Sequence, residues 1–391
     1  MAPLFSLAFA LALLSLKAAA ASSIDNKTFE YIVVGSGPGG GPLAANLARA
    51  GHSVLLLEAG ADETENKNVS EWINFNAAGN DPATRWDFFV RHSADDAREA
   101  RYKHRTWHAE PLGIVAEITG DESWMPENMR KYLVKLEKVH YNSTYTHGHD
   151  GWLDMTMLDP GYTTSADAKQ LSELAAQAAG YQSTAAASLL QRDMNGDQPD
   201  RDNLLGPFGG VSHIKPDGRR SSPGYYVRDT AAEGKYPLTV SLHTLATKVI
   251  FDKSKSDSKP KAVGIEYLQG KSLYSADPRY NAADKGIAGK AFASKEVIIS
   301  GGAFNSPQLL LLSGIGPQEQ LKKFNIPLVV DLPGVGQSVA DNYEASIQSL
   351  GKRAVTGMSE IFPNFWKTSQ GAIRDIYMWC GSFSFEGFWP G

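Results

Sequence analysis

The chain has 391 residues, 42% of them hydrophobic, and a formal net charge of −5. This length and apolar content suffice for a large core and for more than one domain. The charge excludes a broad basic surface, so neither nucleic acid nor an anionic membrane is an expected partner. Because Cys380 is the single cysteine, no intrachain disulfide can form, and folding depends on the core and on bound ligand.

Residues 1–21 predict a secretory signal peptide. An apolar stretch at 3–16 is followed by Lys17 and by four alanines, a pattern typical of a cleavage site. The stretch is too short to span a bilayer comfortably, but no Lys or Arg precedes it, so an uncleaved membrane anchor stays open. We expect a secreted, extracellular glycoprotein without membrane contact after cleavage. Its sequons stand at Asn26, Asn68 and Asn142.

A nucleotide-binding βαβ pattern follows. Residues 31–34 predict a strand, 35–40 a glycine-rich turn, 43–50 a helix, and 53–58 a second strand that ends in an acid. In such a unit the free amides and the positive dipole end of the helix hold phosphates. The order of these elements predicts a dinucleotide site rather than a merely structural turn.

The residues of this turn have separate predicted roles. Gly35 permits the tight turn, Gly37 lets a pyrophosphate approach the backbone, and Gly40 lets the helix lie close to the strand. Glu58, 23 positions after Gly35, is placed to accept hydrogen bonds from a ribose hydroxyl. The predicted cofactor-binding residues here are Gly35, Ser36, Gly37, Pro38, Gly40 and Glu58.

The middle of the chain predicts a long polar loop at 66–82 and two amphipathic helices, at 125–139 and 167–179. Between the helices, residues 147–151 predict a loop that contains two histidines and an aspartate. These side chains are possible metal ligands, but no other His or Cys stands at ligand spacing, so an ordinary turn is favoured and no metal is expected. Two further histidines are expected to be satisfied surface or core residues: His213 and His243.

The second half returns to strands, and the last of them runs into Gly301 and Gly302. A helix is predicted from Pro307 to Ser313, with the proline in its first turn. Because open sheets bind ligands at the carboxyl ends of their strands, this second glycine turn indicates another edge of the same nucleotide site. The predicted strands are 238–242, 248–251, 262–267 and 295–300.

Residues 302–316 resemble the second signature of the glucose-methanol-choline (GMC) oxidoreductases, flavoproteins that oxidise alcohols. Residues 35–58, 74–90 and 119–130 resemble fungal members of that family in the same order. The resemblance therefore covers most of the chain from about residue 29 to 343. It implies FAD as the cofactor, which the βαβ pattern alone does not distinguish from NAD.

Carried over by position, the resemblance assigns further residues. Val249 would contact the adenine through main-chain groups, and Glu58 would bind the adenosine ribose. The glycines at 35, 37 and 40 would cradle the FAD pyrophosphate. Gly301, Gly302 and Ala303 are expected near the pyrophosphate. Asp341 and Asn342 are expected beside the flavin.

The implied fold is α/β, with a Rossmann-like FAD-binding domain and a partial α+β substrate domain. After the signal peptide, residues 24–150 and 206–345 would form the two parts of the flavin domain. Residues 151–205 would be a lid or substrate-side insertion. Residues 346–391 would be a truncated start of the substrate domain, whose aromatic side chains are expected to leave an unpaired apolar surface.

The chain departs from the family pattern in three places. It stops at Gly391, before the segment in which relatives carry the catalytic histidine, so no catalytic residue is assigned. Between Trp107 and Ile118 a flavin-contacting stretch of relatives is missing. Residues 338–340 replace the Asn-Leu pattern that precedes the equivalent of Asp341. These departures indicate a truncated paralogue or an imperfect gene model.

The resemblance predicts an FAD-dependent oxidoreductase acting on the CH–OH group of a small-molecule alcohol, with hydride passing to the flavin and quinone or oxygen as acceptor. In this form the chain is expected to be inactive. Two alternatives stay open. One is a non-catalytic remnant or gene-model fragment that binds FAD or adenine nucleotide at most, and the other is an FAD-containing non-redox cyclase of secondary metabolism.

Overall fold

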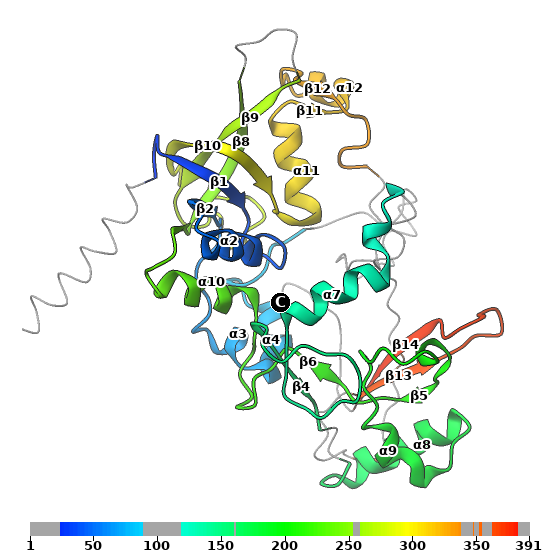
Figure 1. Ribbon diagram of the computed structural model, residues 1–391. Helices are drawn as coiled ribbons and strands as arrows, with labels where there is room; N and C mark the ends of the chain where they lie inside the picture. Colours follow the sequence, from blue (N-terminus) through cyan, green and yellow to red (C-terminus); the bar gives the residue numbers. More distant parts are fainter. Residues whose placement is uncertain are drawn as a thin grey trace, which may run out of the picture.

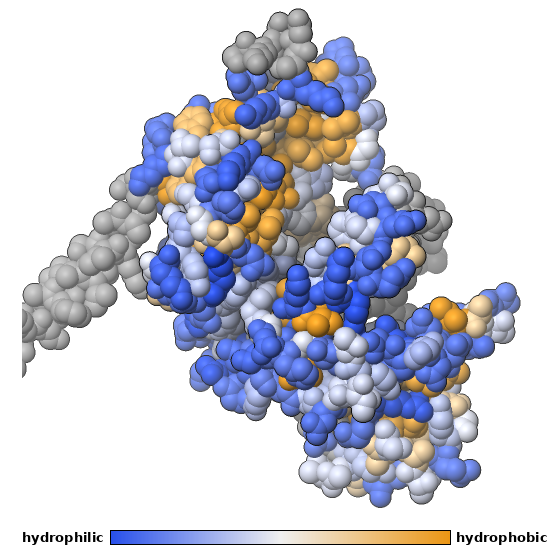
Figure 2. Space-filling model, viewed as in Figure 1, coloured by the Kyte–Doolittle hydropathy of each residue, from blue (hydrophilic) through white to orange (hydrophobic). Residues whose placement is uncertain are grey.

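The computed structural model describes residues 24–88, 119–159, 162–252, 259–337, 347, 352–353 and 362–381. The predicted signal peptide, the segment between Trp107 and Ile118, and the predicted flavin neighbours Asp341 and Asn342 lie outside these residues. Figure 1 shows a six-stranded sheet with α2, α10 and α11 in the upper part of the molecule, and smaller sheets in the lower part. In Figure 2 hydrophobic atoms gather over the upper part, around α11 and beside α2.

The six-stranded sheet joins segments that are far apart in the chain. Four neighbouring strands, β7, β2, β1 and β10, pair in parallel, and β9 and β8 continue the sheet in antiparallel pairing. The α/β fold class is thus confirmed by a sheet of four parallel strands that two antiparallel strands extend. In order across the sheet the strands are β7 (Leu238–Ser241), β2 (Val54–Leu57), β1 (Thr28–Val34), β10 (Ile287–Ile299), β9 (Lys261–Gln269) and β8 (Thr244–Asp252).

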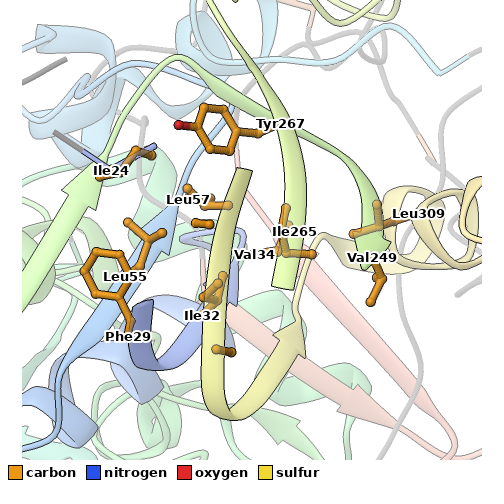
Figure 3. Packing of buried hydrophobic residues seen from close by; sticks show 12 residues of the cluster. Ile24, Phe29, Ile32, Val34, Leu55, Leu57, Val249, Ile265, Tyr267 and Leu309 are labelled. Atoms are coloured by element: carbon orange, nitrogen blue, oxygen red, sulfur yellow. The ribbon is translucent and has the colours of Figure 1, made fainter. Parts of the chain in front are cut away.

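Both faces of the parallel strands are buried. On one face, Val33 and Leu56 pack with Ala44 of α2 and Val227 of α10. On the other face lies a larger apolar cluster, shown in Figure 3, which includes Leu309 of α11. Covered faces explain why β1 and β2 are almost continuous hydrophobic runs rather than alternating patterns. The helices that cover the sheet are α2 (Gly40–Arg49), α10 (Pro223–Ala232) and α11 (Gly302–Leu312).

Two three-stranded sheets form the lower part. One contains β3 (Glu137–Val139), β4 (Leu153–Met157) and β6 (Val211–Ser212), and the other contains β5 (Gly206–Pro207), β13 (Phe362–Trp366) and β14 (Ile376–Cys380). A two-stranded pair, β11 (Ile315–Gly316) and β12 (Val330–Asp331), follows α11. The other α-helices in the described part of the chain are α3 (Lys67–Ser70), α4 (Phe75–Asn80), α7 (Pro126–Leu136), α8 (Ala166–Ala178), α9 (Ala186–Leu189) and α12 (Gln318–Lys323).

Three sequence predictions need correction. The polar region 66–82 is not a continuous loop, because it contains α3 and α4. The helix expected at 125–139 ends at Leu136, since Glu137 turns extended and begins β3 beside β4. Helix α11 begins at Gly302, not at Pro307, which lies inside it. Packing of α11 against β8 and β11 outweighs the single backbone hydrogen bond that Pro307 cannot donate.

Among the described residues, no helix combines the length and apolar character that crossing a membrane requires. The strands predicted at 238–242, 248–251, 262–267 and 295–300 correspond to β7, β8, β9 and the end of β10. Strands from 24–150 and from 206–345 share the large sheet, although the predicted domain boundaries themselves stay a prediction.

Candidate functional site

A cleft of about 630 Å³ opens where β1, β2 and β10 end. The glycine turn after β1 forms one wall, and the first turns of α11 form another. The cleft therefore lies at the carboxyl ends of parallel strands, where open α/β sheets bind ligands. Its lining is mixed, with apolar side chains such as Leu309 and polar ones such as Glu58 and Asn305.

The glycines of the turn differ in what a side chain would meet. Gly35 has a φ of +96°, and a Cβ there would lie 2.5 Å from the carbonyl oxygen of Ser300. A Cβ on Gly40 would lie 2.1 Å from the carbonyl oxygen of Gly35. Around Gly37, by contrast, no atom lies within 4 Å of an added Cβ. Gly35 and Gly40 are thus required by the fold, whereas Gly37 leaves open space at the cleft wall.

Helix α2 presents an uncapped N-terminus to this space. Its N-cap is Gly39, no side chain caps it, and its first turn holds no acidic residue. The Gly41 amide already donates to the Gly37 carbonyl at 3.0 Å, so the helix dipole and the amides that precede Gly41 are what an anion would meet. Pro38 and Gly39 line the cleft beside Gly37. This arrangement suits a pyrophosphate, and the open position at Gly37 leaves room for one.

The carboxylate of Glu58 is held at the end of β2 by three donors. Its Oε2 accepts hydrogen bonds from the backbone N–H of Ser36 at 2.9 Å and from the Ser36 hydroxyl at 2.6 Å. Its Oε1 accepts one from the Gly60 amide at 2.7 Å. A carboxylate has about four acceptor positions, so capacity for a ribose hydroxyl remains. The sequence predicted Ser36 as a cofactor-binding residue of the turn, and its hydrogen bonds to Glu58 follow from tertiary structure.

The second glycine turn packs directly beside the first, since a Cβ on Gly35 would lie 3.2 Å from Gly301 Cα. Gly301 and Gly302 line the cleft, and Gly301 precedes α11 without a side-chain cap. A Cβ on Gly302 would enter open space. Ala303 follows in α11 but is not among the described lining residues. Two helix N-termini, those of α2 and α11, therefore meet one cleft, as the paired glycine turns predict.

The structure places Val249 away from the cleft lining. Its side chain is 4% exposed in the core, and its backbone N–H donates to the Ser313 hydroxyl at 2.8 Å. Residues nearer the start of β8 line the cleft instead. The adenine contact assigned to Val249 stays a prediction. The lining residues of β8 are Thr244, Leu245 and Ala246.

Two aromatic residues that sequence reasoning missed also line the cleft. The rings of Trp86 and Tyr274 meet edge to face, with centroids 5.3 Å apart. The Tyr274 hydroxyl donates to Asn305 Oδ1 of α11 at 2.6 Å, and burial raises the pKa of this tyrosine. These residues come from segments separated by about 190 positions, so no local pattern could have joined them.

The histidines occupy different surroundings. His147 is wholly buried, with Nδ1 2.9 Å from Glu137 Oε2 and Nε2 2.7 Å from Asp193 Oδ2. It lies in the predicted loop, and its side chain joins Glu137 of β3 to the loop that contains Asp193. His243 has a φ of +52° beside the cleft residue Thr244. Its pKa is lowered, first by burial and then by Lys271 and Arg279.

The chain is similar to known oxidoreductases. A family model described as "GMC oxidoreductase" matches residues 118–344, more than half of the chain. Oxidoreductase cicC of Emericella nidulans is 31% identical over 381 residues, which cover 88% of this chain and 56% of that protein. Human mitochondrial choline dehydrogenase is 31% identical over 360 residues, covering 86% and 54%. The chain thus spans about half the length of these curated relatives.

Solved structures support the fold. A formate oxidase variant of Aspergillus oryzae superimposes with a TM-score of 0.57 at 20% identity, covering 79% of this chain and 51% of that one. Pyridoxine 4-oxidase from Mesorbium loti gives a TM-score of 0.55 at 21% identity, covering 78% and 55%. At these identities the likeness shows the fold alone.

Proposed function

The chain belongs to the GMC oxidoreductase family, and from this premise we propose that its cleft binds FAD for the oxidation of a small-molecule alcohol. The observation that carries the proposal is the open backbone at Gly37, placed between the α2 N-terminus and the fixed carboxylate of Glu58. The arrangement fits a nucleotide with a pyrophosphate and a ribose.

The described residues would divide the work of holding FAD. The amides at the start of α2 and the turn at Gly301 and Gly302 would bind the pyrophosphate. Glu58, oriented by Ser36, would accept a hydrogen bond from the adenosine ribose. Trp86 and Tyr274 would exclude water from one side of the cleft. When bound, the flavin would supply the hydride acceptor, while the protein supplies orientation and electrostatics.

Substrate, acceptor and activity of this chain are part of the proposal rather than of the family assignment. The proposed donor is a CH–OH group, in line with the choline dehydrogenases among the relatives. No described residue is assigned as the base that removes the alcohol proton. We also propose that the chain enters the secretory route and that it is glycosylated. Amino-terminal sequencing and deglycosylation of protein expressed in a secreting eukaryotic host test that part.

The cofactor proposal is tested by purifying the chain and titrating it with FAD. We expect near-stoichiometric flavin absorbance in the wild type and binding weakened at least tenfold in Gly37→Val, because the valine side chain fills the phosphate position. Gly334→Val is the matched control, since an added Cβ at Gly334 also meets open space but lies outside the cleft. Equal FAD binding by both variants would contradict the proposal.

Adding alcohols to the flavin-loaded chain then separates the functional alternatives. Bleaching of the flavin absorbance supports alcohol oxidation. Bound flavin that no alcohol bleaches supports the non-redox cyclase. A chain that binds no flavin supports the non-catalytic alternative.

A further inference from the structure

The guanidinium of Arg374 is buried beside the sheet of β5, β13 and β14, where it lies over the Phe365 ring of β13. Its side chain is 8% exposed. The guanidinium carbon lies 4.0 Å from the centroid of the Phe365 ring and 5.6 Å from that of Phe208. Stacking on aromatic faces fixes the plane of the guanidinium, but it satisfies none of the N–H groups, which lie in that plane.

This buried cation lacks hydrogen-bond partners. Nη1 of Arg374 is buried and has no partner in the described structure. Nη2 lies 3.7 Å from Asp202 Oδ1, which is longer than a hydrogen bond. An ionised group removed from water without paired donors carries a large desolvation penalty, and native proteins seldom leave one uncompensated.

A second arginine, Arg201, lies near the same carboxylate of Asp202. Nε of Arg201 is also buried without a partner, and it lies 4.0 Å from the same Oδ1 of Asp202. Both groups therefore converge on one carboxylate oxygen without bonding it. Asp202 is 61% exposed, so water screens its charge. Burial, and then the charge of Arg201, lower the pKa of Arg374, which agrees with an undercompensated cation.

A third arginine adds to the positive charge. The guanidinium of Arg192 lies 5.5 Å from the centroid of the Phe208 ring, the ring that Arg374 also contacts. Its Nη1 donates to the backbone carbonyl of Leu205. Two guanidinium groups, those of Arg192 and Arg374, thus lie over one buried phenyl ring, and the Asp202 carboxylate within 4 Å of Arg374 and Arg201 belongs to an exposed side chain.

We propose that Arg374 and Arg201 bind a small oxyanion, a carboxylate or a phosphate group, next to Asp202. The planar fork of a guanidinium matches the two oxygens of such a group, and this match satisfies donors that otherwise have no partner. Asp202 Oδ1 opposes the anion, but its exposure limits the repulsion. The site shares no residue with the nucleotide cleft, so it stands independently of the proposed function.

The test is thermal unfolding of the purified chain in inorganic phosphate, in acetate and in chloride at one ionic strength and pH. We expect the unfolding midpoint to rise with phosphate or acetate concentration beyond the chloride baseline, because a ligand that binds only the folded state stabilises it. A rise with acetate alone identifies a carboxylate site, and a rise with phosphate alone identifies a phosphate site.

Arginine variants test whether the anion-dependent rise of the unfolding midpoint comes from this site. Arg374→Met should abolish the anion-dependent rise, and Arg201→Met should reduce it several-fold. Arg374→Lys retains the charge but not the fork, so it should bind more weakly than the wild type, and it serves if the methionine variant does not fold. Arg219→Met is the matched control, because Arg219 is an exposed arginine already paired with Asp217.

Two results would overturn the site. One is a wild-type midpoint that responds to phosphate and acetate no more than to chloride. The other is an anion response that persists in the Arg374 and Arg201 variants at the level of the Arg219 control. Either would mean that anions act on the general surface rather than at this pair.

Discussion

The six-stranded sheet and the β5–β13–β14 sheet differ in how far their polar groups are hydrogen-bonded and their apolar side chains buried. In the large sheet region the Glu58 carboxylate receives three hydrogen-bond donors. In the small sheet, Arg374 has no side-chain hydrogen bond in the described structure. The apolar side chains of β14 are also exposed there. The region of the six-stranded sheet, called the closed region below, is held by contacts within the chain. The region of the β5–β13–β14 sheet, called the open region, presents groups that an additional ligand or chain segment would satisfy.

The edge position of β14 explains part of this difference. Among the described strands, β14 pairs with β13 alone, and four of its residues are exposed. The strand carries no charged residue and no proline, the features that usually protect a sheet edge. Part of the apolar surface expected from the sequence is therefore present on β14, whereas Phe362 and Phe365 of β13 are buried. Its exposed side chains are Ile376, Tyr377, Met378 and Trp379.

The largest effect is expected from a substitution that disrupts the packing of the glycine turn in the closed region. Gly40→Ala should destabilise the protein by about 3 kcal/mol or prevent folding, because its Cβ would lie 2.1 Å from the Gly35 carbonyl oxygen and 2.8 Å from Ser300 Cβ. Gly37→Ala is the control and should change stability by about 0.5 kcal/mol or less. Urea unfolding measures both. Similar destabilisation by the two substitutions would contradict the distinction between structural and ligand-facing glycines.

A second test removes the hydrogen bonds of Arg49, a side chain between α2 and α10. Arg49 donates to the hydroxyls of Thr230 and Tyr236 and to the Glu233 carboxylate, and so joins α2 to α10. Because its side chain is 30% exposed, water screens the ion pair, and Arg49→Met should cost about 1–2 kcal/mol of unfolding free energy. Arg219→Met, at an exposed surface pair that water screens, should leave the unfolding free energy near that of wild type. Equal losses would show that the buried Thr230 hydroxyl contributes nothing.

A third test addresses the open region. Trp379→Lys places a charge on the edge strand β14 and should reduce both the fluorescence of a hydrophobe-binding dye and the tendency to aggregate. Tyr280→Lys replaces an aromatic side chain of similar exposure elsewhere. It should leave both readouts near wild type. Monomeric elution of the wild-type chain from a sizing column, without dye binding, would refute the prediction.

The smallest expected effect depends on pH. The side chain of Lys295 on β10, followed by the Ser53 amide, lowers the pKa of Glu30 on β1 to about 2. Because this folded-state pKa lies below the unfolded value of 4.5, the stabilisation is present above pH 4.5 and is lost as the pH falls toward 2. Glu30→Gln should therefore be less stable than wild type at pH 6, and the difference should vanish near pH 2. A difference independent of pH would exclude this ion pair as its cause.

Local patterns were sufficient for the elements that lie close together in the chain. The β1–turn–α2–β2 unit follows from a glycine spacing and a hydrophobic period that act within about 30 residues. The predictions that failed lie where distant contacts decide. Glu137 leaves the helical pattern because β3 pairs with β4 and His147 reaches its carboxylate. Pro307 is accommodated inside α11, a helix that begins five residues earlier.

The sequence by itself determined the α/β class, the two glycine turns, the acid at the end of β2 and the family resemblance, because each depends on short spacing and local backbone requirements. Tertiary structure alone decided that Ser36 holds Glu58, that Trp86 meets Tyr274 in the cleft, and that Arg374 is buried without a partner. Those contacts join positions 22 to about 190 residues apart, or depend on burial. Neither hydrophobic periodicity nor a motif carries information over such distances.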